Sequence, residues 1–275
     1  MKFYLAFFLL TIYFNIHSQE PDSRIRISEF HLQGGFLYSP IEIGSLEDFK
    51  KLAPQSVLLK NDFSTFKASN TLSSSRSNIE SIQLGILFKN KQNPLLRIGL
   101  SHLNYSSLHN NYRKEESFHI DTLTSSQTGQ QTYIDSVSSQ NYSMDFSSQE
   151  IRFDASLIFR TDAAARMSLF GGFGFSIGTT YKTNTTISYR QDNSSQENYW
   201  SGNSNIESFT TKNFLTSTLF IPMGLDFRIS KNNAFLKRLH VYYEMKPSFF
   251  ISSIPELRTF TNVNFIQVLG LKVAL

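Results

Sequence analysis

Cysteine is absent from all 275 residues of this chain. Disulfide bonds, cysteine-ligated metal sites and lipidation of an N-terminal cysteine are therefore excluded. The chain also lacks a run of basic residues: its net charge of +4 is spread along the sequence, so a nucleic-acid partner is not implied. It contains no glycine-rich phosphate loop and no metal-ligand spacing. We therefore expect neither a cofactor nor a metal, and no enzymatic activity.

Long apolar runs are missing too, apart from one at the N-terminus. There, Met1 and Lys2 precede an apolar stretch from Phe3 to Phe14, and small and polar residues follow up to Gln19. This pattern predicts a secretory signal peptide over residues 1–18. A membrane anchor is the alternative, but the stretch is shorter than the roughly 20 residues that a spanning helix needs. Without another apolar run, a mature chain that enters a membrane must do so as a closed β-barrel.

Apolar and polar residues alternate with period two through the rest of the chain. In the segment 82–88, for example, four apolar side chains point to one face of a strand while their neighbours point to the other. The loop over residues 112–145 has β-prone arms, so we expect a hairpin there that extends the sheet; it also permits ten strands as an alternative count. The alternation predicts eight spanning strands near residues 29–39, 77–89, 95–108, 148–160, 166–182, 212–229, 236–252 and 260–275.

The connections between these strands alternate in length. Tight turns occupy residues 90–94, 161–165 and 230–234, and the intervening connections span 40–76, 109–147, 183–211 and 253–259. Outer-membrane barrels have short periplasmic turns and longer external loops. Residues 19–275 are therefore predicted to form one all-β domain, a transmembrane antiparallel up-and-down β-barrel with long extracellular loops and both termini on the periplasmic side.

The apolar rows are expected to face lipid, with aromatic residues at both ends of the rows. Such placement is typical of interfacial girdles, although Phe and Tyr are favoured in any strand. One expected girdle, near the termini and tight turns, consists of Phe30, Phe88, Phe159 and Phe227. The other, near the long connections, consists of Tyr38, Tyr105, Tyr181 and Phe249.

The opposite faces of the strands carry charges and glycines. An eight-stranded barrel is just wide enough for side chains to fill it, so we expect hydrogen-bonded ion pairs around trapped water and a plugged interior. Asp226 and His240 are expected to face each other across the third tight turn. The predicted lumen charge network consists of Arg97, Arg152, Asp154, Asp226, Arg228, His240, Glu244, Lys246 and Lys272.

Two features of the long connections carry further predictions. Residues 45–54 have a Ser N-cap, acidic residues in the first turn and Pro54 at the stop, which predicts a short helix. Its apolar face is expected to pack on the barrel rim, and docking of a partner is the alternative. In the third connection, Tyr199 and Trp200 are candidates for loop-mediated recognition, since polar loops with isolated aromatics occur at binding sites.

His102 beside Ser101 is the nearest approach to a catalytic pair for lipid hydrolysis. Adjacent strand residues face opposite sides of a sheet, so Ser101 does not reach His102 easily, and no orienting acid is evident. A structural histidine at the membrane interface is the expected interpretation.

The layout of eight strands, tight turns, long outer loops and a polar interior resembles the small outer-membrane barrels of the OmpA transmembrane-domain and OmpX type. Gly270, Val273 and Leu275 match the glycine and apolar positions of that family's terminal-strand insertion signal. Val268 stands where a polar residue is usual, and Leu275 replaces the usual terminal aromatic. The resemblance implies residence in the outer membrane, contact with outer-membrane lipid and insertion by the barrel assembly machinery.

The function expected from these observations is that of a non-enzymatic outer-membrane barrel with a filled polar lumen. Such a barrel would stabilise the envelope or bind an extracellular ligand through its loops. A narrow channel or transport accessory is one alternative, and a lipid-modifying enzyme is another.

Overall fold

The strands of the barrel follow one another in chain order. The computed structural model describes residues 25–69, 73–88, 94–124, 126–162, 165–194, 199–233 and 235–275. The predicted signal peptide lies outside the described residues. The ring consists of β1 (Ile25–Ile43), β3 (Ser73–Phe88), β4 (Leu95–Thr124), β5 (Gln131–Arg160), β6 (Met167–Ser194), β8 (Leu215–Phe220) with β9 (Met223–Arg228), β10 (Leu239–Ser253) and β11 (Thr259–Ala274).

Neighbouring strands of this ring are antiparallel, and β11 closes it by pairing with both β10 and β1. β8 and β9 share one position, because both pair with β6 on one side and with β10 on the other. Pro222 lies between them and has no N–H to donate, which accounts for the break in what was predicted as one strand. The predicted eight-stranded up-and-down barrel is confirmed, and the ten-stranded alternative is wrong.

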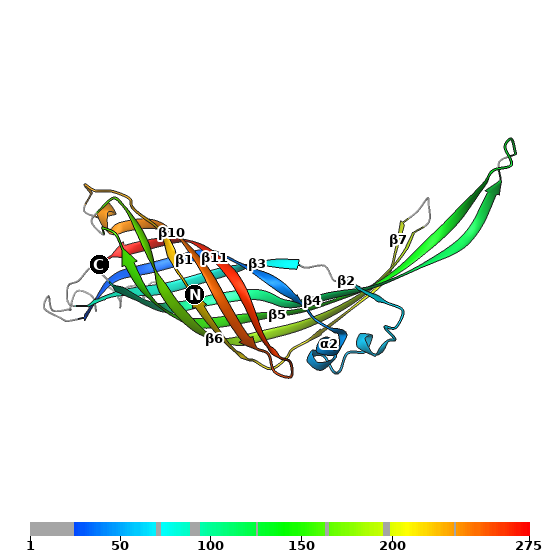
Figure 1. Cartoon of the computed structure of the whole chain (residues 1–275), viewed down its shortest axis with the longest axis horizontal. Coiled ribbons are helices and arrows are strands. Elements are labelled where there is room, and N and C mark those ends of the chain that lie inside the picture. Colours follow the sequence, from blue (N-terminus) through cyan, green and yellow to red (C-terminus); the bar gives the residue numbers. More distant parts are fainter. Residues whose placement is uncertain are drawn as a thin grey trace.

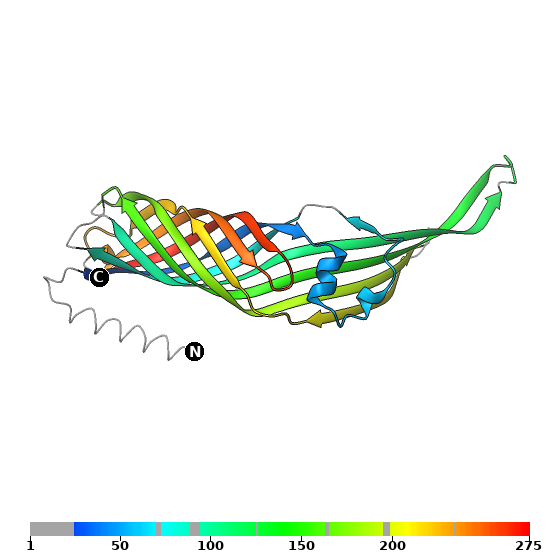
Figure 2. The same cartoon turned by 60° about the horizontal axis from the view of Figure 1, so that its bottom comes forward.

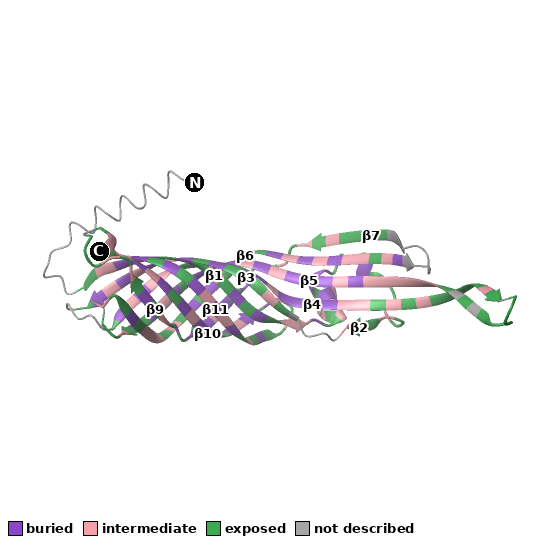
Figure 3. Ribbon diagram, turned by 90° about the horizontal axis from the view of Figure 1, so that it is seen from above, coloured by how far each residue is buried: buried purple, intermediate pink, exposed green. Residues whose placement is uncertain are grey.

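The outer wall of the barrel is apolar. Exposed and buried residues alternate along the strands (Figure 3), and Phe173, Leu219, Val263 and Leu269 expose between 61% and 72% of their surface. Contiguous apolar surface of this kind is unusual on a water-soluble monomer. One predicted girdle residue is placed wrongly: Tyr105 is buried inside the barrel, because it shares the inward face of β4 with Leu103.

Three strands continue far beyond the barrel and form an extension, the long sheet that projects from one end (Figures 1 and 2). The ladder between β4 and β5 runs from Leu95–Ile158 out to Thr124–Gln131, so the predicted hairpin forms, and the strand ends predicted at 108, 148 and 182 are wrong. β6 pairs along β5 up to Ser194, and β7 (Tyr199–Phe209) returns along β6. On the other edge, β2 (Lys67–Ser69) pairs with β4.

The connection from β1 to β2 folds over the junction between barrel and extension. It contains α2 (Leu46–Leu52), where the predicted helix is found, and the 3-10 turn η1 (Leu58–Lys60). The Ser45 side chain accepts a hydrogen bond from the Asp48 N–H and the Asp48 carboxylate accepts one from the Ser45 N–H, which is a capping box. A second 3-10 turn, η2 (Leu236–Arg238), precedes β10. In the described part of the chain, no helix combines the length and apolar character that crossing a membrane requires.

Candidate functional site

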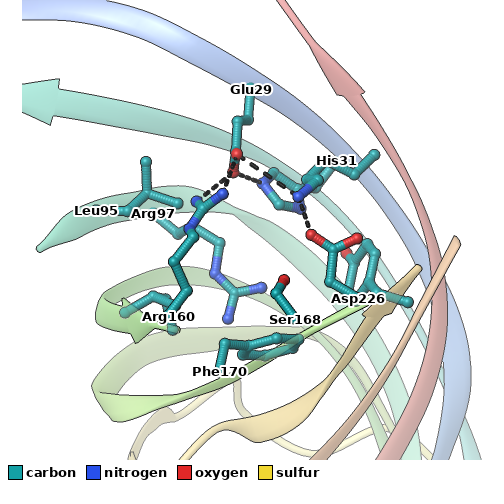
Figure 4. A pocket seen from close by; sticks show the side chains of 11 residues that line it. Glu29, His31, Leu95, Arg97, Arg160, Ser168, Phe170 and Asp226 are labelled. Carbon is teal, nitrogen blue, oxygen red and sulfur yellow. Dashed lines mark hydrogen bonds and ion pairs between the residues drawn. The ribbon is translucent and has the colours of Figure 1, made fainter. Parts of the chain in front are cut away.

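The lumen contains an ion-paired layer near the end with the tight turns (Figure 4). Glu29 on β1 accepts two hydrogen bonds from the Arg160 guanidinium, at 2.5 and 2.9 Å. The same carboxylate lies 3.1 Å from Nε2 of His31 and 3.6 Å from Nζ of Lys272. These side chains come from three strands, so their pairing ties β1, β5 and β11 together across the interior.

Lys272 also links this layer to a second carboxylate. Its Nζ donates to Asp226 on β9, and Nδ1 of His240 on β10 lies 2.8 Å from the other oxygen of Asp226. The expected proximity of Asp226 and His240 is therefore found. Arg228 is half-buried and stands directly opposite His240 in the ladder.

A second layer surrounds Glu244, whose side chain is completely buried. Arg97 on β4 donates to both of its oxygens, at 2.7 and 3.2 Å, in the bidentate geometry that favours Arg–carboxylate pairs. Nζ of Lys246 lies 3.3 Å from Glu244 and donates to Oε1 of Gln33 at 3.1 Å. Gln33 in turn donates to Gln83 at 3.0 Å, so hydrogen bonds continue from β10 through β1 to β3.

A third buried pair lies closer to the extension. Arg152 donates to Glu150, which also accepts a hydrogen bond from Oγ1 of Thr216 at 2.8 Å. The Arg152 guanidinium stands 4.8 Å from the ring centre of Phe250, within cation–π range. Asp154 is buried on the same face of β5.

These layers leave little internal space. The cavity between Glu29, Arg97, Phe170 and Tyr242 measures about 20 Å³, which is room for about one water molecule. Eight of the nine predicted lumen residues are at most 8% exposed, and Arg228 is the exception. The prediction overlooked the acids Glu29 and Glu150, which share the inward face of their strands with His31 and Arg152.

An apolar plug closes the lumen at the end that carries the extension. Phe49 and Leu52 of α2, at 0% and 5% exposure, pack on side chains of β4, β5 and β6. The apolar face of the helix therefore packs on the rim, as expected. The buried members of this plug are Phe49, Leu52, Ala53, Leu58, Leu59, Leu108, Tyr142, Met144, Phe146, Ile187, Phe214, Ile254 and Phe260.

Beyond the plug, the face that lines the lumen continues as one face of the extension. Tyr112, Tyr142, Tyr189 and Asn205 lie opposite one another on β4, β5, β6 and β7 and form a continuous rung, here called the tyrosine rung. Tyr142 and Tyr189 have ring centres 4.8 Å apart. Burial raises the pKa of Tyr112 and of Tyr189 above its ordinary value.

The remaining predicted candidates are Tyr199 and Trp200 on β7 and the pair of Ser101 and His102 on β4. The backbone of Tyr199 and Trp200 pairs with Ser194 and Asn193 in the β6–β7 ladder, and their side chains lie outside the described part of the structure. His102 is on the outer wall, where Nε2 lies 2.9 Å from the Tyr181 hydroxyl, whereas Ser101 is buried in the lumen.

The strand pairing defines the chain as an eight-stranded antiparallel barrel with the extension at one end. No group of three or more His, Asp or Glu residues is placed to hold a metal ion within the described ranges. No family model matches the chain, and no curated protein matches it.

Several solved structures are similar at low scores. Neisserial surface protein A is 12% identical, with a TM-score of 0.32 over 90% of this chain and 97% of that one. Ail, the attachment invasion locus protein of Yersinia pestis, is 12% identical, with a TM-score of 0.29 over 90% of this chain and 99% of that one. Scores this low carry no conclusion about activity, and the barrel assignment rests on the strand pairing.

Proposed function

We propose that this protein is a non-enzymatic barrel of the outer membrane, closed to ions, that holds the extension outside the cell as a binding surface. The observation that carries the proposal is the combination of an exposed apolar wall with an interior filled by ion pairs. Lipid around the wall removes the apolar side chains from water, and the antiparallel ring satisfies the backbone hydrogen bonds that lipid cannot. Outer-membrane lipid is then the surrounding partner, and the barrel assembly machinery inserts the chain through β11.

The filled interior favours this function over a narrow channel. Arg97, Glu244 and Lys246 meet inside the barrel, and the apolar plug lies above them. A pathway for ions would require these buried pairs to separate. Separation would leave charges without partners in a region of low dielectric constant, which is costly.

The structure also disfavours the lipid-modifying enzyme. Ser101 and His102 lie on opposite sides of the wall, and the Tyr181 hydroxyl next to His102 donates to Gln149 at 3.0 Å. This chain of hydrogen bonds orients the histidine toward an amide, and not toward Glu80, the carboxylate opposite it in the β3–β4 ladder.

The length of the extension supports a role outside the cell. β4 and β5 each contain 30 residues, about three times the nine to eleven that a strand needs to cross the hydrocarbon core. Tight turns occupy the opposite end of the barrel, where outer-membrane barrels have their periplasmic turns.

Single cysteines test the orientation, because the natural chain has none. Ser126→Cys places a thiol at the tip of the β4–β5 hairpin, and Asn232→Cys places one in the turn before η2. Both positions are exposed. On intact Gram-negative cells we expect a membrane-impermeant maleimide to label the first variant and to reach the second only after permeabilisation. The reverse pattern would contradict the proposal.

A further inference from the structure

A groove lies on the extension, between the end of the β1–β2 connection and the tyrosine rung. Phe63 and Phe66 of that connection pack on Tyr142, with ring centres 4.8 and 5.3 Å away. Next to these rings, space remains between the connection and the sheet. The resulting groove has a volume of about 520 Å³, within the range of roughly 300–1,000 Å³ that is usual for small-molecule sites.

The groove combines aromatic rings with planar polar side chains. One wall is the connection, which contributes Asn61, Asp62 and Phe66; the floor is the sheet, which contributes Gln140, Tyr189 and Asn205. Asn61 donates to the Tyr142 hydroxyl at 2.7 Å, and this hydrogen bond holds its amide at the edge of the groove. Amides and a carboxylate supply both donors and acceptors, and the half-buried Tyr189 ring supplies a flat apolar surface.

The charges in the groove are unsuited to an anion. Lys114 lines it, but its Nζ already pairs with the Glu116 carboxylate at 2.6 Å. Asp62 accepts hydrogen bonds from the Ser64 N–H and hydroxyl, both at 2.9 Å, and these bonds lower the pKa of its carboxyl. A negative carboxylate beside a paired cation repels phosphate and sulfate groups.

We propose that this groove binds a neutral oligosaccharide. Sugar rings present an apolar face of C–H groups, which packs on an aromatic ring, and a rim of hydroxyls, each of which donates and accepts hydrogen bonds. Tyr189 and Phe66 match the first property, and Asn61, Asp62, Gln140 and Asn205 match the second. The inference rests on the proposed function, because a ligand outside the cell reaches the groove only if the extension is outside.

The test uses the full-length protein in lipid nanodiscs and an array of defined oligosaccharides. The neutral arm consists of glucose, galactose and N-acetylglucosamine oligomers, and the anionic arm of heparin oligosaccharides. We expect binding in the neutral arm, weakened about tenfold or more by Tyr189→Ala and by Gln140→Ala. Tyr133→Ala is the matched control, since Tyr133 is an exposed tyrosine of β5 on the distal hairpin, and it should bind like wild type.

Tyr189 packs on Tyr142, so its variant is checked by circular dichroism, and Gln140→Ala provides a substitution without loss of an aromatic contact. Absence of neutral binding at millimolar concentration overturns the inference. So does binding in the anionic arm alone, or neutral binding that both folded variants retain. The cysteine labelling is evaluated separately. Labelling of Ser126→Cys on intact cells, together with no binding to any oligosaccharide of the array, overturns this inference and leaves the proposed function unaffected.

Discussion

Glu244 is a completely buried carboxylate of the lumen that accepts hydrogen bonds from Arg97 and pairs with Lys246. Neither cation can reach bulk water from its position, since both are at most 6% exposed. The ion pairs of Glu244 are therefore maintained by the exclusion of bulk water as much as by their own attraction.

Glu244→Ala should lower the free energy of unfolding by about 3–5 kcal/mol, because it leaves buried cations without their counter-ion. Urea titration in lipid vesicles, followed by circular dichroism, measures the change. Glu256→Ala is the matched control: it removes an exposed carboxylate that pairs with Lys212 at 3.0 Å, and it should leave the midpoint unchanged. Equal midpoints for both variants would show that the lumen pairs contribute nothing to stability.

Sequence reasoning locates the inward charges by their alternation, but it does not assign their partners. Arg152 and Glu150 are two residues apart on one strand, whereas Arg97 and Glu244 are on strands far apart in the chain. The second kind of pair depends on curvature of the ring, which no local pattern encodes. Glu29 is not among the predicted lumen residues because it is the first residue of a predicted strand. The face to which a side chain points is hardest to assign at the end of a strand.

At the scale of elements, the distal hairpin is separate from the rest of the sheet. Pairing between β5 and β6 begins at Val137, so residues 118–124 and 131–136 form a two-stranded ribbon beyond it. Its large apolar side chains are exposed, including Phe118, Ile120 and Leu123 at 53–58%. Two strands alone are marginally stable in water, so the ribbon depends on the sheet beneath it rather than supporting it.

Replacement of residues 118–136 by an Asn-Gly turn, which the paired residues Ser117 and Val137 would flank, should therefore leave the barrel intact. We expect an unchanged urea midpoint, unchanged circular dichroism and the same oligosaccharide binding, because the groove lies nearer the barrel. Asn-Gly suits a two-residue hairpin loop. A lower midpoint would mean that the ribbon contacts and stabilises the remainder of the extension.

At the scale of the whole molecule, three closures act in series along the barrel axis. The layer at Glu29, the layer at Glu244 and the apolar plug beneath α2 each fill the cross-section. Sealing therefore does not depend on one element, and movement of the β1–β2 connection alone would not open a path.

Purified protein in planar bilayers should show no single-channel steps at 100 mM salt or above. Wild type is compared with a variant in which residues 44–66 are replaced by a Gly/Ser linker; this removes α2 and η1 but leaves both ion-paired layers. Both proteins are expected to be silent, because the ion pairs remain. Steps in wild type would favour the channel alternative, and steps in the variant alone would place the seal in the plug.

The sequence by itself determined the all-β class, the eight strands and, for most strand positions, which side chains face the wall or the interior. These depend on the period-two alternation and on turn length, and both are local properties. Only the tertiary structure decided that β4, β5 and β6 continue unbroken from the barrel into one sheet, that α2 closes the lumen, and that Tyr142 and Tyr189 line a groove beside a loop. Such features depend on the pairing register between strands that are distant in the sequence. A polar strand outside the barrel is stable only because the strand with which it pairs extends equally far.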